Sequence, residues 1–146
     1  MNVNDSAVVW KSSNTSISND ATVNPDPHLI HTGLSAGTYW FELKQRIDAA
    51  TGVGYRWLLN PTNGAVVSSD SCTLSGFQGT MNADAISPTV GNSNSGSLGP
   101  YAIQEIRGNF TLSTGGDIGL EWAQHTANAN DTVVKENSSF LLVRTA

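Results

Sequence analysis

The chain has few charged residues, and this shortage limits its partners. Only 13% of its 146 residues are charged, about half the usual share, and the formal net charge is −5. The seven lysines and arginines are scattered singly. They do not form the basic surface that nucleic acids or anionic membranes require. We therefore expect no nucleic-acid partner and no membrane partner.

Cysteine is nearly absent. The single Cys72 excludes an intrachain disulfide, and we expect this thiol to be reduced and buried. The N-terminus lacks the basic and apolar regions of a signal peptide. No apolar run approaches the roughly 20 residues that cross a bilayer. The sequence thus predicts a soluble protein that is synthesised in the cytoplasm.

Familiar catalytic motifs are missing as well. The chain has no nucleophile elbow, P-loop, dinucleotide-binding motif or EF-hand pattern. Three histidines lack further ligands at a spacing that would hold a metal: His28, His31 and His125. Three mid-strand acids could form a glycosidase pair, although outward-facing acids are ordinary on strands: Glu42, Glu105 and Glu121. We expect no enzyme activity, no cofactor and no metal.

Small polar residues take the place of the missing charge. Ser, Thr, Asn and Gly make up 59 of the 146 residues. This mixture suits strand faces and turns, and it suits helices poorly. Four Trp, four Phe and three Tyr supply apolar area for a core. The composition predicts one all-β domain.

Alternation of apolar and polar residues identifies the strands. In residues 37–48, Tyr39 and Phe41 fall on one face and Trp40 on the other, which is typical of a half-buried strand. Residues 53–60 form a partner strand with the same alternation. Trp40 is a candidate for burial by another subunit.

Turn signals separate the strands. Asn24-Pro25-Asp26-Pro27 indicates a turn or an extended elbow, and Asn63-Gly64 indicates a hairpin. Residues 87–100 form a Gly/Ser/Asn-rich loop. The spacing of these signals predicts an antiparallel jelly-roll sandwich of about eight to ten strands.

Three segments carry a resemblance to known proteins. Leu-Ser-Ala-Gly-Thr-Tyr-Trp-Phe-Glu at residues 34–42 resembles a strand of small virion proteins of tailed bacteriophages. The resemblance continues through residues 119–124 and the closing strand at residues 138–144. Similar strands occur in the trimeric jelly rolls of the C1q and tumour necrosis factor type. The resemblance implies a trimeric jelly roll on a phage particle.

A capsid decoration (cement) protein is the main function that this resemblance implies. Such a homotrimer would bind the major capsid protein and stabilise the outer capsid surface, as a non-enzymatic component of the virion. The alternative is a receptor-binding or glycan-binding knob of a phage fibre or tail. An enzyme acting on glycans is a third possibility.

The N-terminal segment is the candidate for contact with the particle. We divide the chain into an N-terminal strand or arm, residues 1–28, and a jelly-roll domain, residues 29–146. An arm that pairs with a neighbour gains main-chain hydrogen bonds without charge. It is equally open that residues 7–10 are the first strand of the sandwich. The candidate partner-binding residues are Val8, Trp10, Pro25, Pro27 and Trp40.

Overall fold

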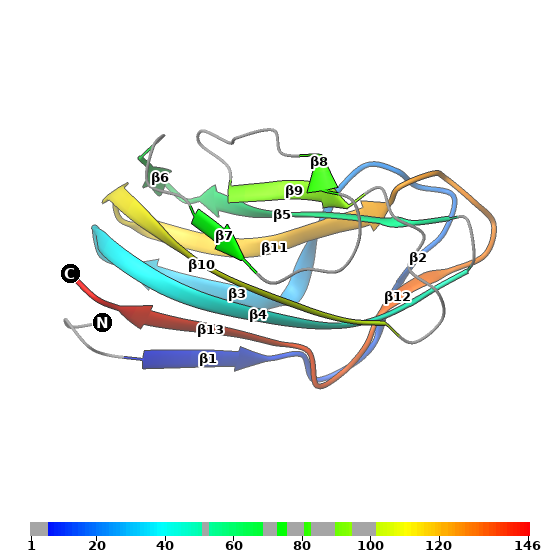
Figure 1. Cartoon of the computed structure of the whole chain (residues 1–146), viewed down its shortest axis with the longest axis horizontal. Helices are drawn as coiled ribbons and strands as arrows, with labels where there is room; N and C mark the ends of the chain where they lie inside the picture. The colour runs from blue at the N-terminus through cyan, green and yellow to red at the C-terminus, as the bar shows by residue number, and fades with distance from the viewer. Residues whose placement is uncertain (1–5, 51–52, 69–72, 76–80, 83–89, 95–101) are drawn as a thin grey trace.

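The computed structural model describes residues 6–50, 53–68, 73–75, 81–82, 90–94 and 102–146. Within these ranges every regular element is a β-strand, and the strands form two facing antiparallel sheets (Figure 1). The predicted all-β sandwich is confirmed. The described part of the chain contains no helix that is long and apolar enough to span a membrane.

The larger sheet, sheet A, has eight strands. They are β1 (Ser6–Trp10), β2 (Thr15–Ile17), β4 (Gly37–Ala49), β6 (Val66–Val67), β7 (Thr73–Ser75), β10 (Ala102–Thr114), β12 (Thr132–Val134) and β13 (Ser139–Arg144). The main order is β1-β13-β4-β10-β6, with β12 joining β2 to β4 and with β7 beside β10. Strand β1 therefore lies at one edge of sheet A.

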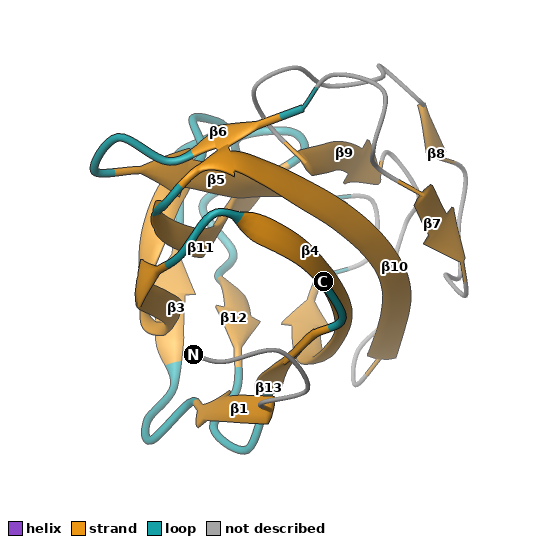
Figure 2. Cartoon of the chain, turned by 90° about the vertical axis from the view of Figure 1, so that its left-hand side faces the viewer, coloured by secondary structure: helices purple, strands orange, loops and turns teal. Residues whose placement is uncertain are grey.

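The smaller sheet, sheet B, has five strands in the order β3-β11-β5-β9-β8. They are β3 (Asn24–Leu34), β5 (Tyr55–Thr62), β8 (Met81–Asn82), β9 (Val90–Asn94) and β11 (Gly116–Gln124). In the end-on view, β13, β4 and β10 curve around one side of the molecule and β3, β11 and β5 close the other (Figure 2). The described strands outnumber the eight to ten expected because five of them are only two or three residues long.

The core lies between the sheets and follows the predicted alternation. On β4, Tyr39, Phe41 and Leu43 are completely buried. On β5, Tyr55 and Trp57 are also buried. Every second residue of these strands thus faces the opposite sheet, which is the geometry of a sandwich core.

The Asn63-Gly64 signal gives a turn but not the predicted hairpin. Both residues have positive φ, 50° and 86°, and Ala65 N–H donates to Thr62 C=O at 3.1 Å. The chain nevertheless crosses to the other sheet, because β6 pairs with β10 and not with β5. The turn therefore connects the two sheets.

The two prolines of the predicted elbow lie inside β3. Pro25 is aligned with Glu121 of β11. Strand β3 is at the edge of sheet B, where a residue without an N–H is tolerated. The register shifts between the Gly119 and Glu121 pairings, and the additional β3 residues include Asp26. Of the two alternatives, the extended elbow is the one observed.

The N-terminal segment, residues 1–28, contributes strands to both sheets: β1 and β2 to sheet A and the start of β3 to sheet B. Strand β1 pairs with β13 over five residues, and the expected division at residue 28 falls within β3. Cys72 and most of residues 87–100 lie outside the described residues. The predicted loop does contain a strand, β9, which pairs with β5.

His31 links the two sheets and sets an expected pH dependence. Its Nε2 lies 2.8 Å from Phe140 C=O, and the His31 and Phe140 rings pack edge to face. Burial lowers the pKa of His31 below its ordinary value of 6.5. The imidazole of His31 therefore has a lower pKa in the folded chain than in the unfolded chain. Because the unfolded chain binds the proton more readily, the free energy of unfolding falls as pH decreases through 6.5.

Substituting His31 tests this dependence. We expect His31→Phe to flatten the loss of stability between about pH 7 and about pH 5, because the titrating imidazole is gone. Urea unfolding midpoints measured across this range would show it. An unchanged slope in the variant would assign the pH dependence to other groups.

Candidate interaction surface

The outer face of sheet A carries apolar side chains that the core does not use. Val9 of β1 packs against the core, so its neighbours Val8 and Trp10 point outward. Val8 is 45% exposed and Trp10 is 59% exposed. Two large apolar side chains this exposed on one short edge strand indicate a contact surface.

Strand register extends this surface across three strands. Val8 is aligned with Leu141 of β13, and Val143 of the same strand is aligned with Trp40 of β4. Aligned residues of antiparallel strands share a face. Trp40, Leu141 and Val143 are each half-buried. We call this set the apolar strip: Val8, Trp10, Trp40, Leu141 and Val143.

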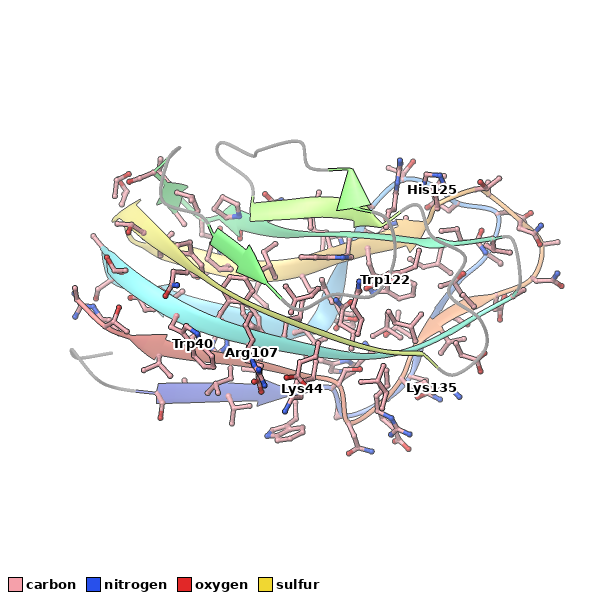
Figure 3. All side chains as sticks on the ribbon, in the orientation of Figure 1. Trp40, Lys44, Arg107, Trp122, His125 and Lys135 are labelled. Carbon is pink, nitrogen blue, oxygen red and sulfur yellow. The ribbon has the colours of Figure 1, made fainter. Side chains whose placement is uncertain are left out.

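A closed ring of opposite charges borders the apolar strip. Glu42 and Lys44 lie on β4, and Glu105 and Arg107 lie on β10. Lys44 Nζ is 3.0 Å from a Glu42 carboxylate oxygen and 3.8 Å from one of Glu105. Arg107 Nε donates to Glu42 at 2.7 Å, and the Arg107 guanidinium also pairs with Glu105. Figure 3 shows Trp40, Arg107 and Lys44 along this face.

Mutual pairing within this ring shifts the protonation equilibria. The hydrogen bond from Arg107 lowers the pKa of Glu42, and Lys44 lowers it further. Glu42 in turn raises the pKa of Lys44. The charged forms of Glu42, Lys44 and Arg107 are therefore favoured by their pairing. The charged side chains of the ring thus pair with one another, whereas the apolar side chains of the strip have no such partner among the described residues to account for their exposure.

Two of the five predicted contact residues lie elsewhere. Val8, Trp10 and Trp40 share the outer face of sheet A, whereas Pro25 and Pro27 are exposed on β3 of sheet B. A depression of about 190 Å³ lies beside Pro25. This is below the ~300–1,000 Å³ of typical ligand pockets.

The residues considered for chemistry are dispersed or already paired. Glu121 accepts a hydrogen bond from Asn60 at 2.7 Å on sheet B, away from the charged ring on sheet A. His31 forms a hydrogen bond with the backbone carbonyl of Phe140 on β13. Across the described ranges, no three His, Cys, Asp or Glu side chains are grouped so that they could hold a metal.

Sequence reasoning missed part of the apolar strip. Leu141 and Val143 belong to the closing strand predicted at residues 138–144, and their outward orientation is an addition from the structure. The alternation with buried Phe140 and Leu142 is the signal that identifies them as outward-facing. Ile103 on β10 is another exposed apolar side chain of sheet A, with 63% of its surface accessible.

Comparisons with known proteins support the fold. No family model matches the chain, and no curated protein matches it. A crystal structure of murine APRIL at pH 8.5 is similar with 14% identity and a TM-score of 0.50, over 96% of this chain and 99% of that one. A second murine APRIL structure, at pH 8.0, gives 12% identity and a TM-score of 0.49 over the same shares.

A viral protein is more distant. The VP2 subviral particle of infectious bursal disease virus gives 7% identity and a TM-score of 0.36, over 95% of this chain and 40% of that one. Likeness at such identities concerns the fold alone. Together with the sheet topology, the similarity to the APRIL structure confirms the predicted antiparallel jelly-roll fold.

Proposed function

We propose that the protein is a non-enzymatic structural module of a phage virion, a homotrimer that decorates and stabilises the outer capsid surface. It would be synthesised in the host cytoplasm and bind the major capsid protein. The observation that carries the proposal is the apolar strip. It joins exposed Trp10 and Val8 on an edge strand to half-buried side chains on two neighbouring strands.

The edge position of β1 suits attachment to another protein. Among the described strands, β1 forms ladder hydrogen bonds with β13 alone, so the main-chain groups on its other side are available for pairing with a partner strand. Trp10 would act as the anchor, because a tryptophan buries a large area at one point. Affinity of this kind does not require charge, in agreement with the low charge content.

Trimeric assembly would multiply weak contacts. Three copies on a symmetric capsid bind together with an avidity far above that of one copy. Heterologous interfaces in a trimer close into a ring. Light scattering should therefore give about three times the 15.4 kDa of the chain. A monomer at micromolar concentration would contradict this assembly.

Capsid attachment tests the role of the strip. We expect Trp10→Ser to lower the affinity for capsids lacking the protein by about 30-fold or more, the effect of losing a hot-spot residue. Val8→Ser should weaken binding less. Val66→Ser is the matched control, because Val66 is 43% exposed but lies on β6. Cosedimentation with capsids measures all three variants.

The outcomes separate the roles of the strip. Loss of attachment with an intact trimer supports a capsid contact. Loss of the trimer in Trp10→Ser would make the strip a subunit interface and overturn the capsid assignment. Failure of the wild-type protein to bind capsids would overturn the decoration function itself.

A receptor-binding or glycan-binding knob is the second candidate. The observation that favours it is the exposed indole of Trp10, since aromatic rings also stack on sugars. Adsorption of the wild-type protein to host cells or glycans, without affinity for capsids, would select this function.

A further inference from the structure

A lysine and an aspartate meet in the interior of the sandwich. Lys11 directly follows β1 of sheet A, and Asp26 belongs to β3 of sheet B. The Lys11 Nζ lies 2.6 Å from Asp26 Oδ2, and both side chains are 0% exposed. Burying an ion pair completely is costly, because neither charge keeps its hydration.

The Asp26 carboxyl group is held in one orientation. Its Oδ1 accepts hydrogen bonds from the backbone N–H groups of His28 at 3.0 Å and Leu29 at 3.1 Å. Its Oδ2 accepts one from Trp122 Nε1 at 3.1 Å. Two backbone N–H groups thus donate to the same oxygen of the Asp26 carboxyl group. This is the arrangement of an oxyanion hole, which stabilises negative charge on such an oxygen during a reaction.

Lys11 is fixed equally well. Its backbone N–H donates to Ser138 C=O at 2.9 Å, and its C=O accepts from Asn137 N–H at 2.9 Å. Its Nζ donates to Thr15 Oγ1 at 2.7 Å, and His28 Nδ1 lies 3.3 Å away. A nitrogen nucleophile therefore faces a carboxyl group, with an imidazole nitrogen beside it.

We propose that Lys11 and Asp26 join in an intramolecular isopeptide bond. One Nζ proton passes directly to Oδ2, and the neutral amine attacks Cγ. Negative charge forms on Oδ1, where the backbone N–H groups of His28 and Leu29 stabilise it. His28 Nδ1, unprotonated in the reacting tautomer, takes a second proton from Nζ and delivers it to Oδ2.

The reaction balances without a co-reactant. One C–N bond forms and one C–O bond breaks, and Oδ2 leaves with two protons as water. The interior favours this outcome in two ways. It removes the unfavourable buried charges, and it keeps bulk water from hydrolysing the product.

Such a bond would tie the end of the edge strand to the opposite sheet. It would fix the strand that carries Val8 and Trp10, although it does not depend on the proposed capsid contact. It would also give the described part of the chain a covalent cross-link that needs no cysteine.

Intact-mass spectrometry of the purified full chain tests the bond. We expect a mass lower by one water molecule than the sequence mass, whereas Lys11→Arg and Asp26→Ala should show their full sequence masses. Trypsin should no longer cleave after Lys11, so residues 1–44 should appear as one fragment lacking one water. Asp26→Asn should lose ammonia in place of water if its side chain reacts in the same way.

Two internal features, together with the tryptic fragment, help to assign a loss of water to this pair. A succinimide at Asp26 cannot form, because the following residue, Pro27, has no backbone N–H. The partly exposed pair of Lys135 and Asp48, 3.1 Å apart, serves as a control that should stay unlinked. The wild-type mass decides the question even where a variant fails to fold. A full sequence mass with normal cleavage after Lys11 would overturn the proposal.

Discussion

Replacing Asp26 by alanine is expected to lower the free energy of unfolding by roughly 3–5 kcal/mol, the cost of leaving a buried charge without its partner. The Lys11 ammonium would keep only Thr15 Oγ1 and His28 Nδ1 as neighbours. Trp122 Nε1 would lose its acceptor as well. Domains of ordinary size have about 5–15 kcal/mol of stability in total, so this substitution approaches global unfolding.

Replacing Lys11 should lower the free energy of unfolding by less than replacing Asp26. In Lys11→Met the Asp26 carboxylate keeps three N–H donors, from His28, Leu29 and Trp122. The methionine side chain fills a similar volume without a charge. Guanidinium unfolding of both variants should therefore rank Asp26→Ala below Lys11→Met in stability.

A surface pair provides the control for the Asp26 measurement. Asp48→Ala breaks the partly exposed pair with Lys135 and should cost about 1 kcal/mol or less. If the isopeptide bond is present, Asp26→Ala loses a further ~3 kcal/mol, because a link across 15 residues no longer restricts the unfolded chain. Equal losses in Asp26→Ala and Asp48→Ala would show that burial of the first pair has no energetic consequence.

Strands that alternate regularly could be predicted from sequence because the alternation is itself the cause of their burial. Residues 37–48 became β4 with Tyr39 and Phe41 inside. The same holds for residues 53–60, which contain Tyr55 and Trp57 of β5. A two-residue period encodes which face meets the core, and no long-range information is needed.

Connections between sheets were harder to predict because a turn does not specify its partner strand. Asn63 and Gly64 adopt the positive φ that their types allow. Whether the next strand returns to β5 or crosses to β10 depends on the position of the other sheet. Prolines gave a similar ambiguity, since an edge strand accepts them as readily as a turn does.

The Lys11–Asp26 pair gave no signal in the sequence. Lys11 precedes a Ser/Thr/Asn-rich stretch, where a lone lysine is expected to be solvated. It is buried because Ser138 and Asn137 hold its backbone against the closing strand. The apolar strip could be predicted only in part. Its residues come together through the register of β1 with β13 and of β13 with β4, which the sequence does not specify.

Deleting residues 1–12 distinguishes an attachment arm from an integral strand, and we expect the truncated chain to lose its fold. The deletion removes all five β1 residues aligned with β13, and it exposes that edge of sheet A. It also removes Val9 from the core margin. Asp26 loses the lysine with which it is paired in the interior.

These losses combine, so the truncation should lower the free energy of unfolding by more than Lys11→Met does alone, because it also removes the β1 pairing and Val9. Circular dichroism and light scattering would then show unfolding or aggregation of the truncated chain. The variants Val8→Ser and Trp10→Ser should remain folded, because the side chains of Val8 and Trp10 point outward. A truncated protein that keeps its unfolding free energy and its trimer, yet no longer attaches to capsids, would make residues 1–12 a detachable arm. The outward-facing and inward-facing residues of this segment therefore predict separable defects: substitutions at Val8 and Trp10 impair attachment, and removal of Val9 of β1 and of Lys11, which follows it, impairs folding.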